Sequence, residues 1–315
     1  MENFSLVAKQ VAILFVLIGA GVVCRKTKLV DEFSVRGMVN VLVTVVTPAL
    51  IIECFQRPFE SSMLAQFGVA FAVAAAMHVF LIALSRFTAR GDENELPVLR
   101  VATVFSNAGF MGIPLEYAIL GSKGVFYGIV YVAMFNLFMW TWGLRQMTNG
   151  ECEVKNRGVS FCTLKSLLNP GTVGLMIGLP LFLFSVSLPD VVRTPIRLMS
   201  ELNTPLAMLV IGFFLADADL GSVSRSRQAH LATAIRLVAS PLVLLGVFVL
   251  ARGWLDRTMM LALVVAASAP VGAMVAMFAS KYHRDVDLAV GLVSGSTIVS
   301  VLTMPPIIAL AMTVL

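Results

Sequence analysis

The sequence predicts an all-α polytopic membrane protein with ten transmembrane helices, and three observations support this fold class. Of its 315 residues, 58% are hydrophobic and only 13% are charged, whereas soluble domains carry roughly 25% charged residues. Ten apolar stretches are long enough to cross a bilayer, which takes about 20 mainly apolar residues. Two of these stretches, one in each half of the chain, are interrupted by glycine and proline at corresponding places.

The predicted spans form two sets of five, joined by a polar linker. The first repeat covers residues 1–143, the linker residues 144–166 and the second repeat residues 167–315. The linker is rich in charged and amide side chains and is too short for a folded soluble domain. The predicted spans are residues 5–24, 36–55, 64–86, 97–119, 123–143, 167–187, 194–216, 229–251, 257–281 and 286–314.

Short matches between the two halves indicate an internal repeat. They occur in the same order at offsets of 157 to 161 residues. Ile18-Gly19 matches Ile177-Gly178, Arg36 matches Arg197, Thr47-Pro48 matches Thr204-Pro205, and Gly112 matches Gly272. Because five is an odd number, the second repeat enters the membrane from the opposite side. The pattern therefore predicts a 5+5 inverted repeat, an arrangement found in many secondary transporters.

The basic residues are distributed unevenly between the two predicted sides. With the N-terminus placed outside, sixteen of the 23 Lys and Arg residues fall on the cytoplasmic side, which includes the linker. The positive-inside bias therefore places both termini outside. The net charge of +5 reflects this orientation, so the expected surroundings are membrane lipid and not nucleic acid. The first apolar stretch lacks a basic leader and is interpreted as a retained span, not a signal peptide.

The two interruptions are expected to form the functional site. The fourth span contains the run Ser106–Pro114 and the ninth contains Ser268–Gly272. A helix broken at membrane depth is tolerated only where protein buries it or where it lines a wet cavity, and paired breaks indicate a substrate site. The exposed N–H ends attract anions, and the carbonyl ends suit a cation. Residues 101–119 and 260–279 contain no Lys or Arg, so anion binding is expected without a basic side chain at the crossing.

The same residues resemble a known family. The polar and proline positions of the second, fourth and seventh spans, together with the inverted repeat, resemble the auxin efflux carrier family, which includes plant PIN carriers and bacterial malate or malonate permeases. The matching residues are Asn40, Thr47-Pro48, the run Asn107–Pro114 and Thr204-Pro205. The resemblance covers nearly the whole chain, the run in the fourth span is its most specific part, and the short linker is similar to that of bacterial members.

The resemblance implies a carrier of small organic anions, located in the inner membrane if the source is bacterial. It implies a scaffold built from helices 1, 2, 6 and 7, often homodimeric. Helices 3–5 and 8–10 would then form the moving transport domain, in which the broken helices 4 and 9 cross.

Polar and small residues at or facing the breaks are the candidate substrate-binding residues. Asn107 comes first, because its amide offers two donors and an acceptor; the alternative is that it only caps the broken half-helix. Ser268 is a weaker counterpart, and Pro270 either frees a carbonyl or simply kinks the helix. The full set is Asn107, Gly109, Met111, Gly112, Ser268, Pro270, Gly272, Asn40, Thr47, Asn203, Thr204 and Asn136.

Coupling to H⁺ or Na⁺ is expected to involve Glu201, because intramembrane carboxylates are costly and usually functional. The alternative is a helical ion pair between Glu201 and Arg197, one turn before it. His78 is a weaker candidate for a proton relay, and it fits equally well as a packing residue. Glu53 and Glu116 lie near predicted span ends, where solvated positions are expected.

No enzyme is expected. The chain lacks the His-Glu-x-x-His, Gly-x-Ser-x-Gly and P-loop motifs, and its four cysteines match no zinc motif, so neither a cofactor nor a metal is predicted. The sequence therefore predicts a secondary active transporter of a small organic anion, either a mono- or dicarboxylate such as malate or malonate or an auxin-like acid. The alternatives are an anion channel and a membrane sensor built on a transporter fold.

Overall fold

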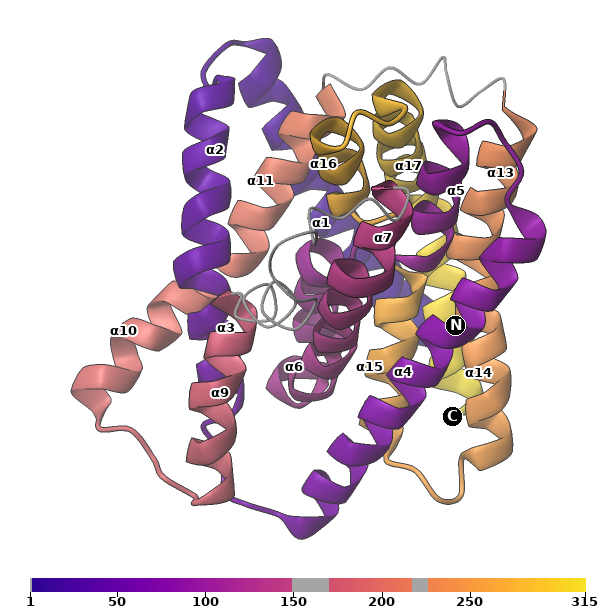
Figure 1. The fold of residues 1–315 in the computed structure, drawn as a ribbon. Helices are drawn as coiled ribbons and strands as arrows, with labels where there is room; N and C mark the ends of the chain where they lie inside the picture. The colour runs from indigo at the N-terminus through magenta and orange to yellow at the C-terminus, as the bar shows by residue number, and fades with distance from the viewer. Residues whose placement is uncertain (1, 149–169, 217–225) are drawn as a thin grey trace, which may run out of the picture.

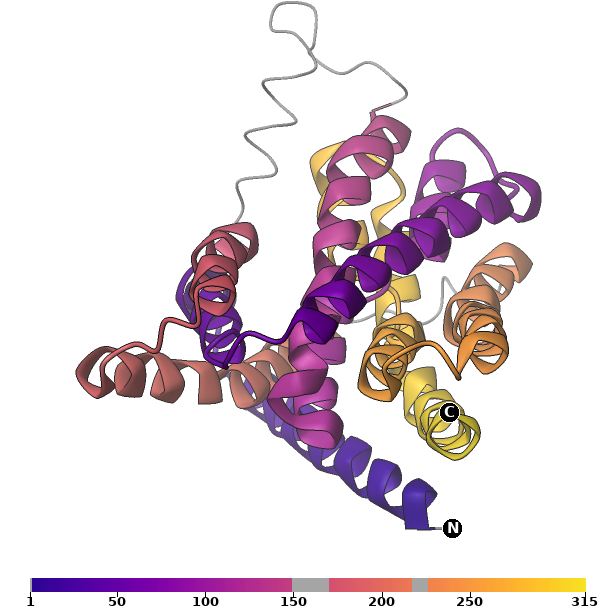
Figure 2. The same ribbon diagram turned by 90° about the horizontal axis from the view of Figure 1, so that it is seen from below.

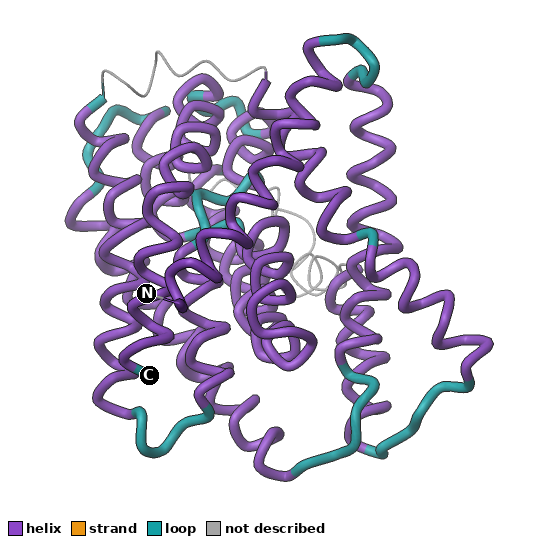
Figure 3. The backbone as a smooth tube through the Cα atoms, turned by 180° about the vertical axis from the view of Figure 1, so that it is seen from behind, coloured by secondary structure: helices purple, strands orange, loops and turns teal. Residues whose placement is uncertain are grey.

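The computed structural model describes residues 2–148, 170–216 and 226–315, and in these ranges the named elements are all helices (Figure 3). The all-α prediction is thus confirmed. Six helical stretches are long and apolar enough to span a bilayer: Glu32–Cys54, Ser61–Thr88, Ala108–Met147, Asp190–Ala216, Arg227–Ala251 and Val286–Val314. Two apolar helices are shorter, Pro170–Leu183 and Arg257–Ser268. Most of the predicted linker lies outside the described residues.

The helices of the described ranges follow one another without strands. Those of the first half are α1 (Glu2–Lys26), α2 (Glu32–Val41), η1 (Leu42–Val46), α3 (Thr47–Cys54), α4 (Ser61–Thr88), α5 (Glu95–Val104), η2 (Ala108–Gly112), α6 (Ile113–Phe138), η3 (Met139–Gly143) and α7 (Leu144–Met147). Those of the second half are α9 (Pro170–Leu183), α10 (Asp190–Glu201), α11 (Asn203–Ala216), α13 (Arg227–Ala234), η4 (Ile235–Ala239), α14 (Ser240–Ala251), α15 (Arg257–Ser268), α16 (Met274–Lys281) and α17 (Val286–Val314). The segments labelled η are π-helical turns, which occur mostly as single-turn bulges inside α-helices.

The chain reverses direction inside α6. Gly121 has non-helical angles there, with φ at 67° and ψ at −161°, in a region that L side chains rarely adopt. Arg100 donates to Gln146 at 3.2 Å, so the chain returns to the end of the molecule from which it started. The turn lies between the predicted spans 97–119 and 123–143, and it separates the broken helix from the helix that follows it.

The helices form two groups that lie side by side (Figures 1 and 2). In one group α1 packs on α11, and α3 packs on α9 and α10. In the other, α15 packs on α6, α14 and α17, while α4 packs on α5 and α6. Contacts of α1 with α6 and α17, and of α11 with η2, join the two groups. The breaks therefore lie close to the boundary between the groups.

Small residues let α1 and α11 approach closely, as is common between membrane helices. A Cβ atom placed on Gly212 would collide with the backbone oxygen of Ile18, and one on Gly21 would collide with that of Leu209. Apolar side chains fill the rest of this boundary, including Leu14 of α1 and Met208 of α11. The first group is thus held together by backbone contact and apolar packing.

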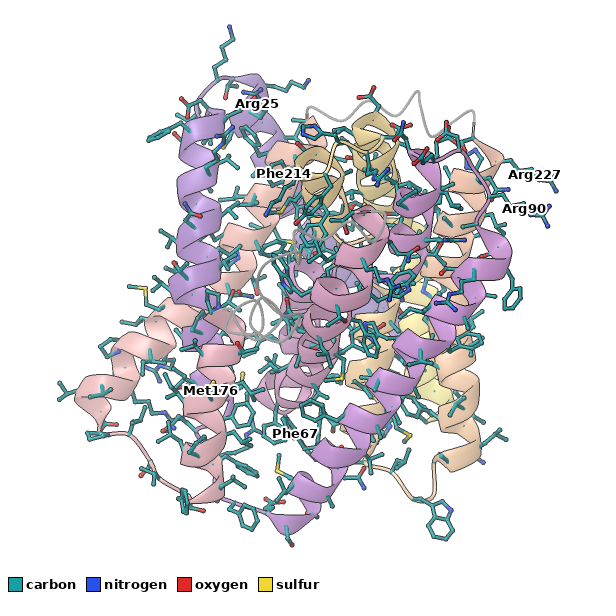
Figure 4. All side chains as sticks on the ribbon, in the orientation of Figure 1. Arg25, Phe67, Arg90, Met176, Phe214 and Arg227 are labelled. Atoms are coloured by element: carbon teal, nitrogen blue, oxygen red, sulfur yellow. The ribbon has the colours of Figure 1, made fainter. Side chains whose placement is uncertain are left out.

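Basic residues mark one end of the molecule. Arg25, Arg90 and Arg227 come from three different loops or helix ends and lie toward the same end (Figure 4). At the opposite end, Arg252 donates to the carbonyl of Val314 at 3.3 Å, so the C-terminus lies beside the loop between α14 and α15. The helix α1 ends at the basic end, with Arg25 and Lys26 in its last turn.

Candidate functional site

The two breaks are joined to each other through their backbones. The N–H of Asn107 donates to the carbonyl of Pro270 at 2.6 Å, and the N–H of Gly272 donates to the carbonyl of Phe105 at 2.9 Å. These two bonds make an isolated antiparallel bridge between Ser106 and Val271. Each break thus supplies partners for backbone groups that the other has freed, as lipid could not.

A third helix supports the second break. The N–H of Val271 donates to the hydroxyl of Ser296 on α17 at 3.0 Å. The backbone of the second break also approaches that of the first closely at Gly272, where only a glycine fits without displacing its neighbour. A Cβ on Gly272 would lie 3.1 Å from the carbonyl oxygen of Ser106. The second break is therefore fixed by tight contacts on two sides.

A pocket lies between the breaks and α11. Its volume is about 30 Å³, and its lining comes from the first break, α11, the start of α16 and α17. The residues that line it are Asn107, Ile211, Phe214, Leu215, Ala273, Val293, Ser294 and Thr297. Phe214 extends from α11 toward the α16 side (Figure 4). A volume of this size holds one or two water molecules.

The pocket faces the starts of two helices. Asn107 is the N-cap of η2, which continues into α6, and Ala273 is the N-cap of α16. The first N–H groups of a helix lack helical partners, and they carry a partial positive charge that attracts anions. Both downstream half-helices therefore direct their positive ends toward the same small space, and the hydroxyl-bearing Ser294 and Thr297 lie on its α17 wall.

The Asn107 side chain does not cap the helix that follows it. Its amide makes no cap hydrogen bond, while its backbone carbonyl accepts from the N–H groups of Met111 at 3.0 Å and Gly112 at 3.1 Å. These are the first backbone bonds of the helix, and they leave its first N–H groups without helical partners. The amide remains available at the pocket wall.

The negative ends of the upstream half-helices meet a buried arginine. Arg236 on η4 has no exposed surface and donates to the carbonyl of Val104 at 2.8 Å and to that of Ala267 at 2.6 Å. It also donates to the hydroxyl of Ser240 at 2.6 Å. Val104 ends α5, and Ala267 is the penultimate residue of α15. One guanidinium therefore bridges both broken helices.

The expectation that no basic side chain reaches the crossing is wrong. The breaks themselves contain none, but Arg236 arrives from the eighth predicted span, about 130 residues along the chain from the first break. The charge distribution of the sequence places Arg236 among the cytoplasmic charges. Only its position seven residues inside the predicted span 229–251 hints at a buried role.

Four candidates from the breaks and their neighbours do not line the pocket. Met111 is buried in the apolar cluster at the group boundary, and a Cβ on Gly112 would lie 3.5 Å from Ala266 of α15, in ordinary contact. The Ser268 hydroxyl donates to the carbonyl of Val264 at 2.7 Å, and the Asn136 amide donates to that of Val132 at 2.9 Å. Both polar side chains thus bond their own helices.

The other break residues are placed differently. Gly109 is exposed, and a Cβ atom added to it would meet no other atom within 4 Å. Pro270 provides the carbonyl that accepts from Asn107. Both residues therefore lie at the crossing, although neither is part of the pocket lining.

The candidates from the second and seventh predicted spans also lie away from the pocket lining. Asn40 is exposed, and Thr47 is half-buried with its hydroxyl donating to the carbonyl of Leu42 at 2.8 Å. Thr204 is half-buried at the start of α11. Asn203 is buried and its side-chain nitrogen has no partner among the described residues. It lies about two helical turns before Ile211, where the pocket wall begins.

The two predicted coupling residues are separated from each other and from the pocket lining. His78 is buried, with Nδ1 2.8 Å from the carbonyl of Ala74 and its ring stacked on Phe138 at 5.3 Å. Glu201 is exposed at the end of α10. The ion pairs of the described residues do not include one between Arg197 and Glu201.

Glu116 and Glu53 were expected to be solvated, and the structure corrects this expectation for both. Glu116 on α6 has no exposed surface, and neither carboxyl oxygen has a partner in the described part of the chain. The carboxyl packs against Gly128, and a Cβ atom at that position would collide with it. Glu53 is paired with Arg193 at 2.9 Å, and its side chain is 15% exposed. In the described ranges, His, Cys, Asp and Glu form no group of three or more that would suit a metal ion.

Two residues of the pocket wall, Ser294 and Thr297, are absent from the set predicted from the sequence. Their spacing of three residues places them on the same face of α17. The surrounding glycines are typical of helix packing, so the polar pair in their midst is the signal that could have identified this wall.

Comparison with known proteins identifies the family. A model of the family described as membrane transport protein matches residues 6–308. An uncharacterized transporter of Methanothermobacter thermautotrophicus is 30% identical over 219 residues, which is 68% of each chain. Auxin efflux carrier component 6 of Arabidopsis thaliana is 29% identical over 136 residues, covering 42% of this chain but only 24% of the plant protein.

A membrane transport family agrees with the six apolar stretches long enough to span a bilayer, and with the family resemblance of the break residues. The family match spans both breaks and the helices that surround them. The chain therefore belongs to the membrane transport protein family, the family of the auxin efflux carriers, and is an integral membrane transporter.

Proposed function

We propose that this protein is a secondary active transporter that moves a small organic anion by alternating access. The substrate class is a mono- or dicarboxylate such as malate or malonate, or an auxin-like acid. The observation that carries the proposal is the pocket whose wall includes the N-caps of two half-helices, Asn107 and Ala273. Two helix starts favour a carboxylate there, and the Asn107 amide adds donors that fix its orientation.

The position of the pocket favours alternating access. It lies where α11 of one helix group meets the breaks of the other. At about 30 Å³ it has room for water but not for a dicarboxylate, so we propose that the two groups shift relative to each other when substrate binds. The arrangement that fits this motion is the ten-span inverted repeat, with a scaffold from spans 1, 2, 6 and 7 and a transport domain from the others.

We further propose that the basic end with Arg25, Arg90 and Arg227 faces the cytoplasm of the plasma membrane, in accordance with the positive-inside bias. Both termini then lie outside. Cysteine labelling of intact cells at positions near the C-terminus tests this orientation. The homodimer implied by the family resemblance stays a prediction, to be tested by the mass of the purified protein in detergent.

The first experiment measures the melting temperature of the purified protein against a panel of carboxylates. A ligand that binds the folded state raises the melting temperature by mass action. Uptake into proteoliposomes then separates three mechanisms. A carrier saturates and accumulates substrate against its gradient, a channel passes it only down its gradient, and a sensor binds without transport. A panel in which no anion shifts the melting temperature or enters the vesicles would contradict the proposal.

For coupling to protons, we propose Glu116 as a third candidate, in addition to Glu201 and His78, which the sequence indicated. Glu116 lies on the broken helix itself, nine residues after Asn107, with both carboxyl oxygens buried and unpartnered among the described residues. The glycines against its carboxyl, Gly112 and Gly128, are uncharged. Burying a carboxyl without a partner costs free energy, and ionisable residues within membrane spans usually have a function.

Glu116→Gln preserves the shape of the side chain and removes its ability to exchange a proton. We expect the variant to lose the dependence of uptake on an imposed pH gradient while it still exchanges labelled for unlabelled substrate. Glu201→Gln and His78→Gln, measured in the same way, show whether either of these groups carries the proton instead. An unchanged pH dependence in Glu116→Gln would exclude Glu116.

A further inference from the structure

The upstream halves of both broken helices end at one point in the protein. The last carbonyls of a helix have no helical partners and carry a partial negative charge. Val104 of α5 and Ala267 of α15 supply such carbonyls, and both accept from Arg236. In secondary transporters with broken helices, the carbonyl ends of half-helices are places where a coupling cation such as Na⁺ is held.

Arg236 has the properties of a permanent occupant of such a place. Its side chain is completely buried, and a guanidinium carries a delocalised positive charge with five N–H donors. Its three described hydrogen bonds go to two backbone carbonyls and the Ser240 hydroxyl. The ion pairs within the described residues involve other arginines and a lysine. The negative charge that faces Arg236 therefore comes from helix ends and not from a carboxylate.

The corresponding position in the first half of the chain carries no equivalent charge. His78 lies 158 residues before Arg236, within the range of offsets between the proposed repeats, and its imidazole bonds its own helix at Ala74. Of these two corresponding positions, only the one in the second half carries an arginine. The Arg236 side chain reaches the helix ends of both halves, at Val104 of α5 and Ala267 of α15. A single cation position shared by α5 and α15 needs one cationic side chain, and Arg236 provides it.

We propose that Arg236 is a tethered cation that occupies the carbonyl site between α5 and α15, so that substrate binding and transport need no Na⁺. This inference rests on the proposed function and deepens it by specifying which ion the crossing does not use. The fixed positive charge also holds the two upstream half-helices together, while the two downstream half-helices remain directed at the pocket. Arg236 acts here as a positioning residue, because its described hydrogen bonds are all to protein groups.

The first test uses the wild-type protein. Uptake in proteoliposomes is measured in NaCl and in choline chloride at equal ionic strength and pH. We expect rates in the two salts to agree within about twofold, since the carbonyl site is already filled. Stimulation by Na⁺ of about tenfold or more, the effect of about 1.4 kcal/mol of coupling free energy, would overturn the inference.

The second test empties the site and needs no knowledge of the substrate. Arg236→Ala leaves two helix-end carbonyls unpaired in a cavity shaped for a guanidinium. We expect its melting temperature to fall and then to rise in millimolar guanidinium or Na⁺, while the wild type shows no such rise. The matched control is Arg252→Ala, which removes an exposed arginine that also bonds a carbonyl. No cation-dependent rise in Arg236→Ala, or an equal rise in the control, would overturn the inference.

Arg236→Lys covers the case in which the alanine variant does not fold. An ammonium offers three donors but lacks the planar fork of a guanidinium, so we expect a folded, less stable protein that remains insensitive to Na⁺. A lysine variant that Na⁺ stabilises would contradict the inference. If instead no organic anion is bound or transported by the wild type, the proposed function fails, while the cation rescue of Arg236→Ala still decides the role of Arg236.

Discussion

The two breaks occupy corresponding places in the two halves of the chain, yet their surroundings differ. The first places the Asn107 side chain at the pocket and leaves Gly109 exposed. The second is packed tightly, with Gly272 against the Ser106 carbonyl and Val271 bonded to Ser296. Under the proposed function, the first break would contact the ligand through Asn107, and the second would provide the rigid surface beside it.

The same asymmetry extends to the helices behind the breaks. The charge that neutralises both upstream helix ends comes from the second half, at Arg236, whereas the buried carboxyl without a described partner comes from the first half, at Glu116. If the two halves form the predicted repeat, each of these two polar groups is supplied by one half only.

The largest expected effect comes from exchanging the polar side chains of the two breaks for alanine. Asn107→Ala removes the amide at the pocket and is expected to weaken substrate binding about tenfold or more, because hydrogen bonds to a charged ligand contribute roughly 1.5–3 kcal/mol. Ser268→Ala removes a hydroxyl that bonds its own helix, so binding should change less than about twofold, well below the roughly 1.4 kcal/mol that a tenfold change requires. Isothermal titration of both purified variants measures the contrast.

Asn136→Ala is the matched control for this comparison, because the Asn136 amide also bonds its own helix and is absent from the pocket lining. If Asn107→Ala bound substrate as tightly as Asn136→Ala, the first break would not be the recognition site.

A smaller effect is expected on stability from two serines near the bridge. Ser296→Ala deprives the buried N–H of Val271 of its acceptor and should lower the free energy of unfolding by roughly 1–3 kcal/mol. Ser106→Ala removes a buried hydroxyl that has no partner in the described structure, so it should be neutral or slightly stabilising. Melting temperatures in detergent measure both, and equal losses would show that the second break is no more tightly held than the first.

The smallest effect is expected from glycine to alanine changes in the two breaks. Gly272→Ala places a Cβ 3.1 Å from the Ser106 carbonyl oxygen, and should cost about 1 kcal/mol of overpacking. Gly109→Ala meets open space and should stabilise its helix by up to about 1 kcal/mol. Opposite signs of the change in melting temperature would sharpen the comparison, and a destabilising Gly109→Ala would contradict it.

Much of the architecture follows from local sequence. Membrane depth requires that backbone groups bond within the segment, so long apolar runs determine the helices directly. The run Ser106–Pro114 and the pair Ala269-Pro270 mark the breaks because proline and glycine weaken a helix, although single prolines also lie inside α9 and α10. Of the twelve proposed substrate-binding residues, Asn107 lines the pocket. Met111, Ser268 and Asn136 were polar or central in the sequence but face their own helices or the apolar core.

Composition and short motifs were enough to specify the helical class, the positions of both breaks and the family. Tertiary packing alone established that the breaks pair through two backbone bonds, that α11 closes the pocket, and that Arg236 bridges Val104 and Ala267. These features join residues more than 30 positions apart, and no local pattern specifies which distant side chain reaches a given helix end. A broken helix leaves backbone groups that need partners, and the packing of the other helices selects the residues that supply them.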